Sequence, residues 1–390
     1  MTTATFEAAA WKDGKRHAWL MGLLIPSLPL LGWALVAATG LSVFWWTGPI
    51  FYFLIIPPLE LLIGEDRNNP PDGAVERLEN DRYYRYCTFL YLPLQYASLI
   101  GSAWLVARGG LSWLDVLGIA LTTGLSSGVG INAAHELGHK KPVLERWLAK
   151  IALAPTAYGH FFVEHNRGHH VRVATPEDPA SSRLGESFWA FLPRSVFGSA
   201  RSAWHLEKER LGRSDQGPWT LRNDVLNAWL MSVLLFGGLI LWLGPVIIPF
   251  LLIQAAYGFM LLEVVNYLEH YGLVRQKQAD GRYERCQPQH SWNSNHVVTN
   301  LLLYHLQRHS DHHTNPTRRY QALRHFEQSP QLPSGYASMV ALAYIPPLWR
   351  WVMDRRVLAH YQGDVTRANV YPPLRRKILA RYGAGAGSRA

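Results

Sequence analysis

Histidine is the residue type whose spacing in this 390-residue chain indicates chemistry. Seventeen histidines are present, and eight of them fall in three short motifs, HELGH, HNRGHH and HSDHH. Imidazole nitrogens are common ligands for zinc, copper, iron and nickel, so motifs of this kind predict metal binding. The eight residues are His135, His139, His165, His169, His170, His309, His312 and His313.

The spacing within the motifs predicts more than one metal ion. In a helix, His135 and His139 share a face, and the same holds for His165 with His169 and His309 with His313. Neighbouring residues diverge by about 100° around a helix axis, so each adjacent His-His pair is expected to address two different metals. His270, which follows the last apolar stretch, is a ninth candidate. Nine ligands exceed the four that one zinc ion takes, so two metals are expected.

The other histidines separate into two kinds. Four stand alone on polar segments, and we expect structural roles for His17, His205, His325 and His360. Four flank the clusters, where a structural role and a hydrogen bond to a ligand are equally compatible with the sequence: His160, His290, His296 and His305.

Neutral imidazole ligands would leave the charge of two divalent ions uncompensated. Nearby carboxylates are therefore expected to offset that charge and to orient the imidazole rings by hydrogen bonds. The candidates lie beside the motifs or near the ends of apolar stretches: Glu60, Glu136, Glu164, Asp178, Glu269 and Asp311.

The first motif also has a competing interpretation. HELGH satisfies the H-E-x-x-H pattern of zinc proteases, in which Glu136 would act as the general base of an intramembrane metalloprotease. Such a site needs only one further ligand and leaves both His-His pairs and His270 without a role. Zinc also has no redox chemistry. A paired site at the mouth of an apolar bundle instead favours iron and an oxidative reaction on a lipophilic substrate.

Six apolar stretches must position these motifs. Hydrophobic residues make up 48% of the chain, and each stretch is long enough to cross about 30 Å of hydrocarbon as a helix. We predict an all-α integral membrane protein with six transmembrane helices in three hairpins and a histidine-rich helical cap, all in one domain. The predicted spans are 18–38, 41–63, 87–107, 113–134, 225–244 and 246–268, the cap is mainly 135–223 and 269–382, and 383–390 is a flexible tail.

Charge predicts the orientation and argues against other partners. Of 38 Lys and Arg residues, only Arg108 lies in the three short hairpin turns, so the positive-inside rule puts the cap and both termini in the cytoplasm. The net charge of +10 fits this bias and contact with anionic lipid, and a docking surface for an acidic partner is the other interpretation.

The basic residues form no nucleic-acid-binding module. Cys87 and Cys286 are too few and too far apart for a thiolate metal site.

Longer strings around the motifs carry a family resemblance. The spacing HxxxH, HxxxHH, HxxHH resembles the membrane fatty-acid desaturase and hydroxylase superfamily, and the longer strings resemble its alkane 1-monooxygenase branch. These strings are GEDRNNPP (64–71), NAAHELGHKK (132–141), GHFFVEHNRGHH (159–170), NYLEHYGL (266–273), HSWNSNH (290–296) and LQRHSDHHTNPTRRYQALR (306–324).

The resemblance implies a non-haem di-iron monooxygenase of the bacterial inner membrane with its active site on the cytoplasmic side. It implies that the two irons are held by the nine histidines, that electrons come from rubredoxin and its reductase, and that dioxygen converts the terminal methyl of a medium-chain n-alkane to a 1-alkanol. Within the superfamily, an acyl desaturase and a xylene-type or other hydrocarbon hydroxylase are the nearest alternatives.

Two further expectations concern the substrate and the electron donor. Terminal attack requires the chain end to be held beside the oxidant, in a narrow apolar tunnel, and the second span offers Trp45, Trp46 and the mid-span Tyr52 as its walls. Rubredoxin iron needs four cysteine thiolates, so we expect the donor to be another polypeptide or a fused domain. Basic residues beside the last cluster are expected to steer an acidic donor: Arg318, Arg319 and Arg324.

Overall fold

The computed structural model describes residues 11–383 of the chain. Apart from Gly383, the predicted flexible tail lies outside the described residues. Within them the regular structure is helical, and β-structure is limited to isolated bridges such as Glu65 with His296. The all-α prediction is confirmed.

Six helical segments are long and apolar enough to cross a membrane, which confirms the predicted number of spans. The third span begins at Arg82, earlier than predicted, and the fourth continues to Gly138, so His135 lies inside the helix and not after it. In chain order the spans consist of η1 (Ala18–Leu23) with α2 (Leu24–Thr39); η2 (Ser42–Trp46), α3 (Thr47–Ile50), η3 (Phe51–Ile55) and α4 (Ile56–Ile63); α6 (Arg82–Phe89) with α7 (Tyr91–Ala107); α8 (Trp113–Gly138); α13 (Asp224–Leu243); and η6 (Pro245–Ile247) with α14 (Ile248–His270).

Local sequence explains why the spans fold back as hairpins. Gly40 ends α2 with a φ of 71°, a left-handed conformation that side chains other than glycine disfavour, and Gly244 ends α13 with a φ of 85°. Ser112 begins α8 with a capping box, in which its hydroxyl accepts from the Asp115 amide while the Asp115 carboxylate accepts from the Ser112 amide. Each apolar run therefore stops and restarts within a few residues.

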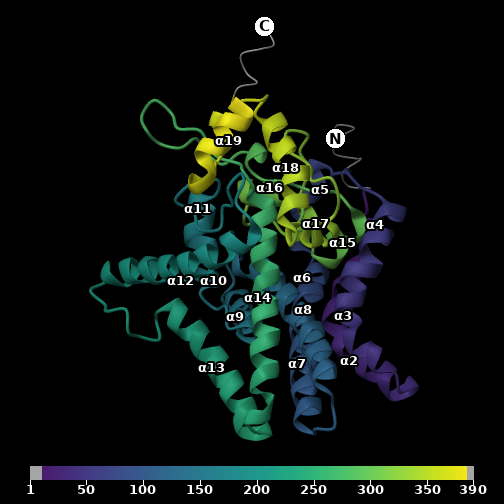
Figure 1. Ribbon diagram of the computed structural model, residues 1–390. Helices are drawn as coiled ribbons and strands as arrows, with labels where there is room; N and C mark the ends of the chain where they lie inside the picture. Colours follow the sequence, from purple (N-terminus) through teal and green to yellow (C-terminus); the bar gives the residue numbers. More distant parts are fainter. Residues whose placement is uncertain (1–10, 384–390) are drawn as a thin grey trace.

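Helices α8 and α14 pack closely, and they carry the first and the ninth candidate ligand. A Cβ atom at Gly128 of α8 would lie 2.8 Å from the carbonyl oxygen of Gly258 in α14, so the two backbones touch at this level. One turn away, the Ser127 hydroxyl donates to the Gln254 side chain at 2.9 Å. Because the two helices run side by side (Figure 1), their ends bring His135 and His270 to the same region.

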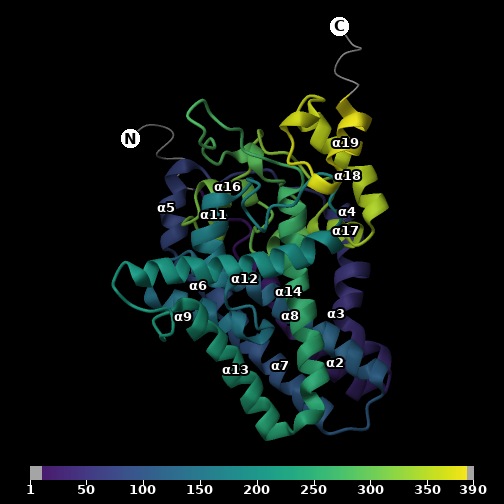
Figure 2. The same cartoon turned by 60° about the vertical axis from the view of Figure 1, so that its left-hand side comes forward.

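The remaining helices form the cap. Figures 1 and 2 show α5, α11, α16, α18 and α19 gathered beyond one end of the spans, while α12 lies crosswise to α14. Their bounds are α5 (Asp72–Asn80), α9 (Val143–Leu153), η4 (Ala154–Thr156), α10 (Phe161–Val163), η5 (Glu164–His169), α11 (His170–Arg172), α12 (Phe188–Gly212), η7 (Pro288–His290), α15 (Val297–Leu302), α16 (His309–Thr314), η8 (Tyr320–Ala322), α17 (Tyr336–Ala343), α18 (Pro346–His360), η9 (Val365–Arg367), η10 (Pro372–Leu374) and α19 (Arg375–Tyr382).

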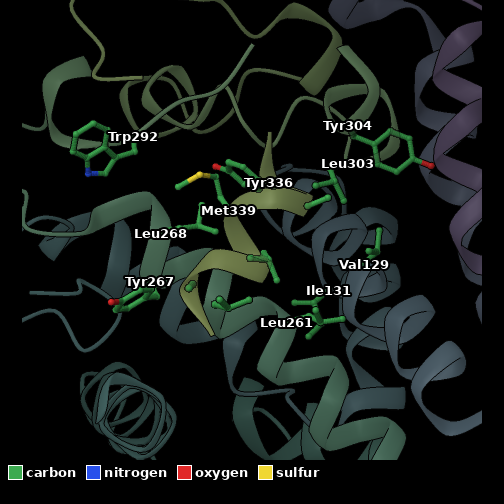
Figure 3. Packing of buried hydrophobic residues seen from close by; sticks show 14 of the residues in the cluster. Val129, Ile131, Leu261, Tyr267, Leu268, Trp292, Leu303, Tyr304, Tyr336 and Met339 are labelled. Atoms are coloured by element: carbon green, nitrogen blue, oxygen red, sulfur yellow. The ribbon is translucent and has the colours of Figure 1, made fainter. Parts of the chain in front are cut away.

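One hydrophobic cluster extends from the spans into the cap. Figure 3 shows Val129 of α8 and Leu261 of α14 in the same packed region as Leu303, Tyr336 and Met339 of the cap. All five side chains are buried. Because close packing leaves little freedom to buried side chains, the cap holds its histidine motifs in fixed positions above the ends of α8 and α14.

Candidate metal centre

The nine predicted histidines lie together in two groups. The first group contains His135, His139, His165, His170 and His312, and the second contains His169, His270, His309 and His313. Within each group, one ring nitrogen from every member lies within 4.8 Å of all the others. The two groups are adjacent, because the ring centroids of His170 and His313 are 4.4 Å apart.

The ring nitrogens point at common centres. In the five-histidine group, His312 Nε2 lies 2.8 Å from His135 Nε2 and 2.9 Å from His170 Nε2. In the four-histidine group, His309 Nε2 lies 2.8 Å from His313 Nε2 and 3.2 Å from His270 Nε2. Several imidazole nitrogens that converge so closely form a donor set suited to a metal ion.

Buried nitrogens without a partner give the same indication. Among the described residues, His139 Nε2 and His169 Nε2 are buried and have no hydrogen-bond partner. A buried polar atom without a partner is costly in a folded protein. A metal ion in each group would use one of these lone pairs, so the residues present fit two metal ions.

The second motif departs from the expected geometry. His165 and His169 were expected to share a helical face, but His165 joins the first group, with its Nε2 3.0 Å from His170 Nε2, and His169 joins the second. The cause is local, since Glu164–His169 is a π-helix and not an α-helix. In an α-helix, residues four apart lie on the same face, whereas the wider turn of a π-helix brings residues five apart together. As expected, each adjacent His-His pair is divided between the two groups.

Burial favours the neutral, metal-binding form of four of the imidazoles in the cap. Desolvation, followed by the neighbouring histidines, holds the pKa of His165 and His312 well below its ordinary value. The same causes lower the pKa of His309 and His313. A neutral ring can offer a lone pair to a metal without first losing a proton.

Two of the six candidate carboxylates contact these histidines. Asp178 accepts from His169 Nδ1 at 2.9 Å, which leaves His169 Nε2 as the nitrogen that faces the group. Glu269 Oε2 lies 3.2 Å from His309 Nε2, and its other oxygen accepts from the Tyr336 hydroxyl at 2.7 Å. Both carboxylates are buried.

The other four carboxylates are engaged elsewhere. Glu136 pairs with Lys140 at 3.1 Å, Glu164 accepts from Arg172 at 2.6 Å, and Asp311 accepts from Arg318 at 2.7 Å. Glu60 accepts from the Thr299 hydroxyl. The pairing of Glu136 with a buried lysine also argues against a role for it as the free general base of a protease.

The arginines predicted to steer a donor are all ion-paired. Arg318 pairs with Asp311, Arg319 pairs with Glu145 at 2.9 Å, and Arg324 pairs with Asp72. Arg318 lies close to the end of α8, because its carbonyl oxygen accepts from Lys140 Nζ at 2.8 Å. Their role in donor docking stays a prediction.

An apolar cavity reaches the metal centre from the membrane region. Its walls come mainly from α8 and α14, and three of the histidines border it. Of the three proposed tunnel residues, Tyr52 lines the cavity, Trp45 lines a separate hollow near Pro29, and Trp46 packs against Gly118. The lining residues are Tyr52, Leu125, Gly128, Val129, Asn132, His135, Phe161, His165, Leu261, Leu262, Val265, Asn266, Glu269, Leu303, Leu306 and His309.

Most of this wall differs from the predicted one. Aromatic residues of the second span were expected, but the walls are chiefly aliphatic and come from the fourth and sixth spans. One available signal was the recurrence of glycine at Gly124 and Gly128 in the fourth span, which marks the face that packs on α14. Leu125 and Val129 follow these glycines directly, and both line the cavity.

The eight other histidines lie outside the two groups. Three of the four flanking residues have polar partners: His290 lies 3.1 Å from a Glu284 oxygen, His296 contacts the Ser294 hydroxyl at 2.9 Å, and His305 contacts the Tyr320 carbonyl oxygen at 2.9 Å. The fourth, His160, packs edge-on against the ring of Tyr158, with the ring centroids 4.2 Å apart. None of these contacts involves a member of either group.

Comparison with known proteins agrees with the geometry of the site. Residues 111–343 match the model of the fatty acid desaturase family, and this range contains all nine histidines. The chain is 48% identical to alkane 1-monooxygenase of Acinetobacter baylyi over 95% of this chain and 92% of that protein, and 45% identical to alkane 1-monooxygenase of Pseudomonas putida over 98% and 95%. It is 30% identical to the xylene/toluene monooxygenase hydroxylase component XylM of Pseudomonas putida over 60% and 63%. The chain therefore belongs to the fatty acid desaturase family and, within it, to the alkane 1-monooxygenases.

Proposed function

We propose that this protein is a monooxygenase that uses dioxygen to hydroxylate n-alkanes of medium chain length at the terminal carbon, with two non-haem iron ions as cofactors. The observation that carries the proposal is the convergence of nine histidines, seven of them buried, into groups of five and four beside an apolar cavity. The names of the relatives support the substrate class.

The nine histidines would hold the two irons, and the irons, when bound, would supply the reductive activation of dioxygen. The protein's own contribution is the orientation of the ligands. Asp178 fixes the His169 ring through Nδ1, and a hydrogen bond of this kind sets the tautomer of a ligating histidine. Glu269 places a buried carboxyl group beside His309 Nε2, the nitrogen that faces the group, where it would help to offset the charge of a bound metal.

The cavity would bind the alkane and direct its end to the metals. His135 borders the cavity at one end and Leu125 lines it ten residues away on the same helix, which corresponds to about 15 Å at 1.5 Å per residue. The aliphatic wall binds a hydrocarbon by burial of apolar surface. A methyl group held against the histidine end is presented to the oxidant in preference to the methylenes behind it, which accounts for terminal selectivity.

Electrons would come from rubredoxin, on a separate chain or in a fused domain, with rubredoxin reductase as its source. His139 and His170 are the two half-exposed members of the nine, so the five-histidine group is the one that approaches the surface. An acidic donor that docks there would meet the basic residues nearby, of which Arg318 is close to the end of α8 and Arg319 and Arg324 lie further along the same loop.

We further propose that the protein is one membrane-embedded domain of the bacterial inner membrane, with the metal centre and both termini in the cytoplasm. The support is the distribution of charge. Arg108 is the only basic residue in the three hairpin turns, which lie at the opposite ends of the spans from the histidine motifs.

The test is to reconstitute the purified protein in lipid nanodiscs with ferrous iron, rubredoxin, its reductase, NADH and a series of n-alkanes under labelled dioxygen. We expect 1-alkanols that carry one labelled oxygen atom. His309→Ala should abolish the product, whereas His360→Ala, a histidine outside both groups, should retain it. Absence of any alcohol, together with bound zinc and cleavage of a membrane peptide, would reverse the proposal in favour of a protease.

A further inference from the structure

A surface groove lies on the histidine side of the bundle, away from the metal centre. Helix α9, the C-terminal half of α12 and the first turn of α13 form its walls. It is lined by Val143, Arg146, Trp147, Lys150, Arg210, Leu221, Arg222, Asp224 and Asn227. We propose that this groove binds the headgroup of an anionic phospholipid such as phosphatidylglycerol.

The charge of the groove favours an anion. Two carboxylates are present in and below it, and their oxygens are already used. Glu207 accepts from Arg167 and Arg210, and Asp224 accepts from Lys150 at 2.6 Å and from Arg167 at 2.7 Å. The groove is left with an excess of positive charge.

Two guanidinium groups supply that excess. Arg146 and Arg222 both line the groove, and no ion pair to either one is present among the described residues. Arg222 is exposed and Arg146 is half-buried, so both are accessible to a ligand. Guanidinium groups bind phosphate oxygens in pairs, and two of them in one groove suit a phosphodiester.

The rim of the groove distinguishes a lipid from a soluble anion. Val143, Trp147 and Leu221 line the same groove and are 67%, 43% and 68% exposed, respectively. The span formed by α13 begins at Asp224, inside the groove, so the groove lies where the apolar part of the bundle starts. Basic residues below a rim of tryptophan and aliphatic side chains at this depth are typical of a site at the membrane interface.

One further atom bears on the headgroup. The Asn227 side-chain oxygen is buried and accepts no hydrogen bond from the described residues, while its Nδ2 donates to the Leu221 carbonyl oxygen at 3.2 Å. A headgroup that carries hydroxyl groups can donate to this oxygen while its phosphate contacts the arginines. The glycerol of phosphatidylglycerol has such hydroxyls, and the choline headgroup has none.

The test measures lipid binding directly, on the full-length protein in detergent, by native mass spectrometry at increasing mole fractions of phosphatidylglycerol or phosphatidylcholine. The test variant is Arg146→Gln combined with Arg222→Gln. The matched control is Arg375→Gln combined with Arg376→Gln, which removes the same charge from exposed positions on α19. Circular dichroism and the melting temperature in phosphatidylcholine establish that both variants are folded.

We expect at least one phosphatidylglycerol to remain bound to the wild-type protein and to the control. The groove variant should bind it about 30-fold more weakly, from the loss of two cations near the headgroup layer. Equal retention by the groove variant and the control would overturn the proposal, as would equal binding of phosphatidylcholine. The proposal would also be overturned if inorganic phosphate raised the melting temperature as much as the lipid does, because the groove would then be an anion site without lipid specificity. Should the double variant fail to fold, Arg222→Gln alone is measured, because that side chain is exposed.

Discussion

Asp178→Asn tests whether a carboxylate outside the ligand set controls the four-histidine group. One Asp178 oxygen accepts from His169 Nδ1 at 2.9 Å and from the Ser181 hydroxyl at 2.6 Å, and the other accepts from the Ala180 amide at 3.2 Å. Both oxygens of the carboxylate are thus in use. The residue is buried, so water cannot replace a lost contact.

An asparagine cannot satisfy these donors in either orientation. If its oxygen faces His169, its NH2 group meets the Ala180 N–H, and two donors oppose each other. If its NH2 group faces His169, the imidazole must accept at Nδ1, which moves its proton to Nε2 and removes the lone pair that points into the four-histidine group. Loss of such a partner weakens metal binding by roughly 10- to 100-fold, or about 1.4 to 2.8 kcal/mol.

The assay is an anaerobic titration with ferrous iron that resolves two sites per chain. We expect one site to weaken in Asp178→Asn and the other to keep its affinity. Asp354→Asn is the matched control, because Asp354 is also a buried carboxylate and its hydrogen bonds come from the hydroxyls of Tyr271, at 2.8 Å, and Tyr382, not from a histidine. Wild-type affinity at both sites of a folded Asp178→Asn protein would refute the reasoning.

Four other outcomes follow from the structure. Tyr52→Ala should extend the accepted alkanes to longer chains while Trp45→Ala leaves the product profile unchanged, and identical chromatograms for both variants would remove Tyr52 from the cavity wall. Gly128→Val should lower the melting temperature, with a cost of about 1 to 3 kcal/mol from overpacking against the Gly258 backbone, whereas Gly237→Val, which meets open space, should not. Glu136→Gln should reduce stability by about 3 kcal/mol, because it leaves the buried Lys140 without its ion-pair partner. The folded fraction should nevertheless keep its iron and its hydroxylase activity. Complete inactivity of iron-loaded protein would argue for Glu136 as a base. Removal of metal by a chelator should abolish hydroxylation, and ferrous iron, but not zinc, should restore it.

The spacing of histidines was sufficient to predict how most of them are divided. Residues one position apart on a helix point in different directions, and accordingly His312 and His313 lie in different groups. Hydropathy was sufficient for the six spans, because a helix that crosses a membrane must be apolar along its length. Both inferences depend on local geometry that the sequence determines directly.

Side-chain direction in irregular segments could not be predicted in the same way. Glu164 and Asp311 stand next to candidate ligands in the chain, but each turns toward an arginine, Arg172 and Arg318 respectively. Asp178 lies eight residues beyond His170 and yet contacts His169. Which carboxylate reaches a histidine is decided by the tertiary positions of competing cations, and proximity in the sequence carries little information about that.

The second span shows how an irregular segment determines which aromatic residue borders the cavity. Pro57 and Pro58 have no backbone N–H and so cannot donate to the carbonyl groups four residues earlier, at Phe53 and Leu54. The preceding residues form a π-helix, in which the Ile56 N–H donates to the Phe51 carbonyl oxygen. A π turn shifts the residues that precede it around the helix axis relative to those that follow. Depth in the membrane favoured Tyr52 from the sequence, but hydropathy does not reveal the irregular turns on which side-chain direction in this span depends. Tyr52, in the π-helix, lines the cavity, and Trp45, in the 3-10 helix η2, lines a different hollow.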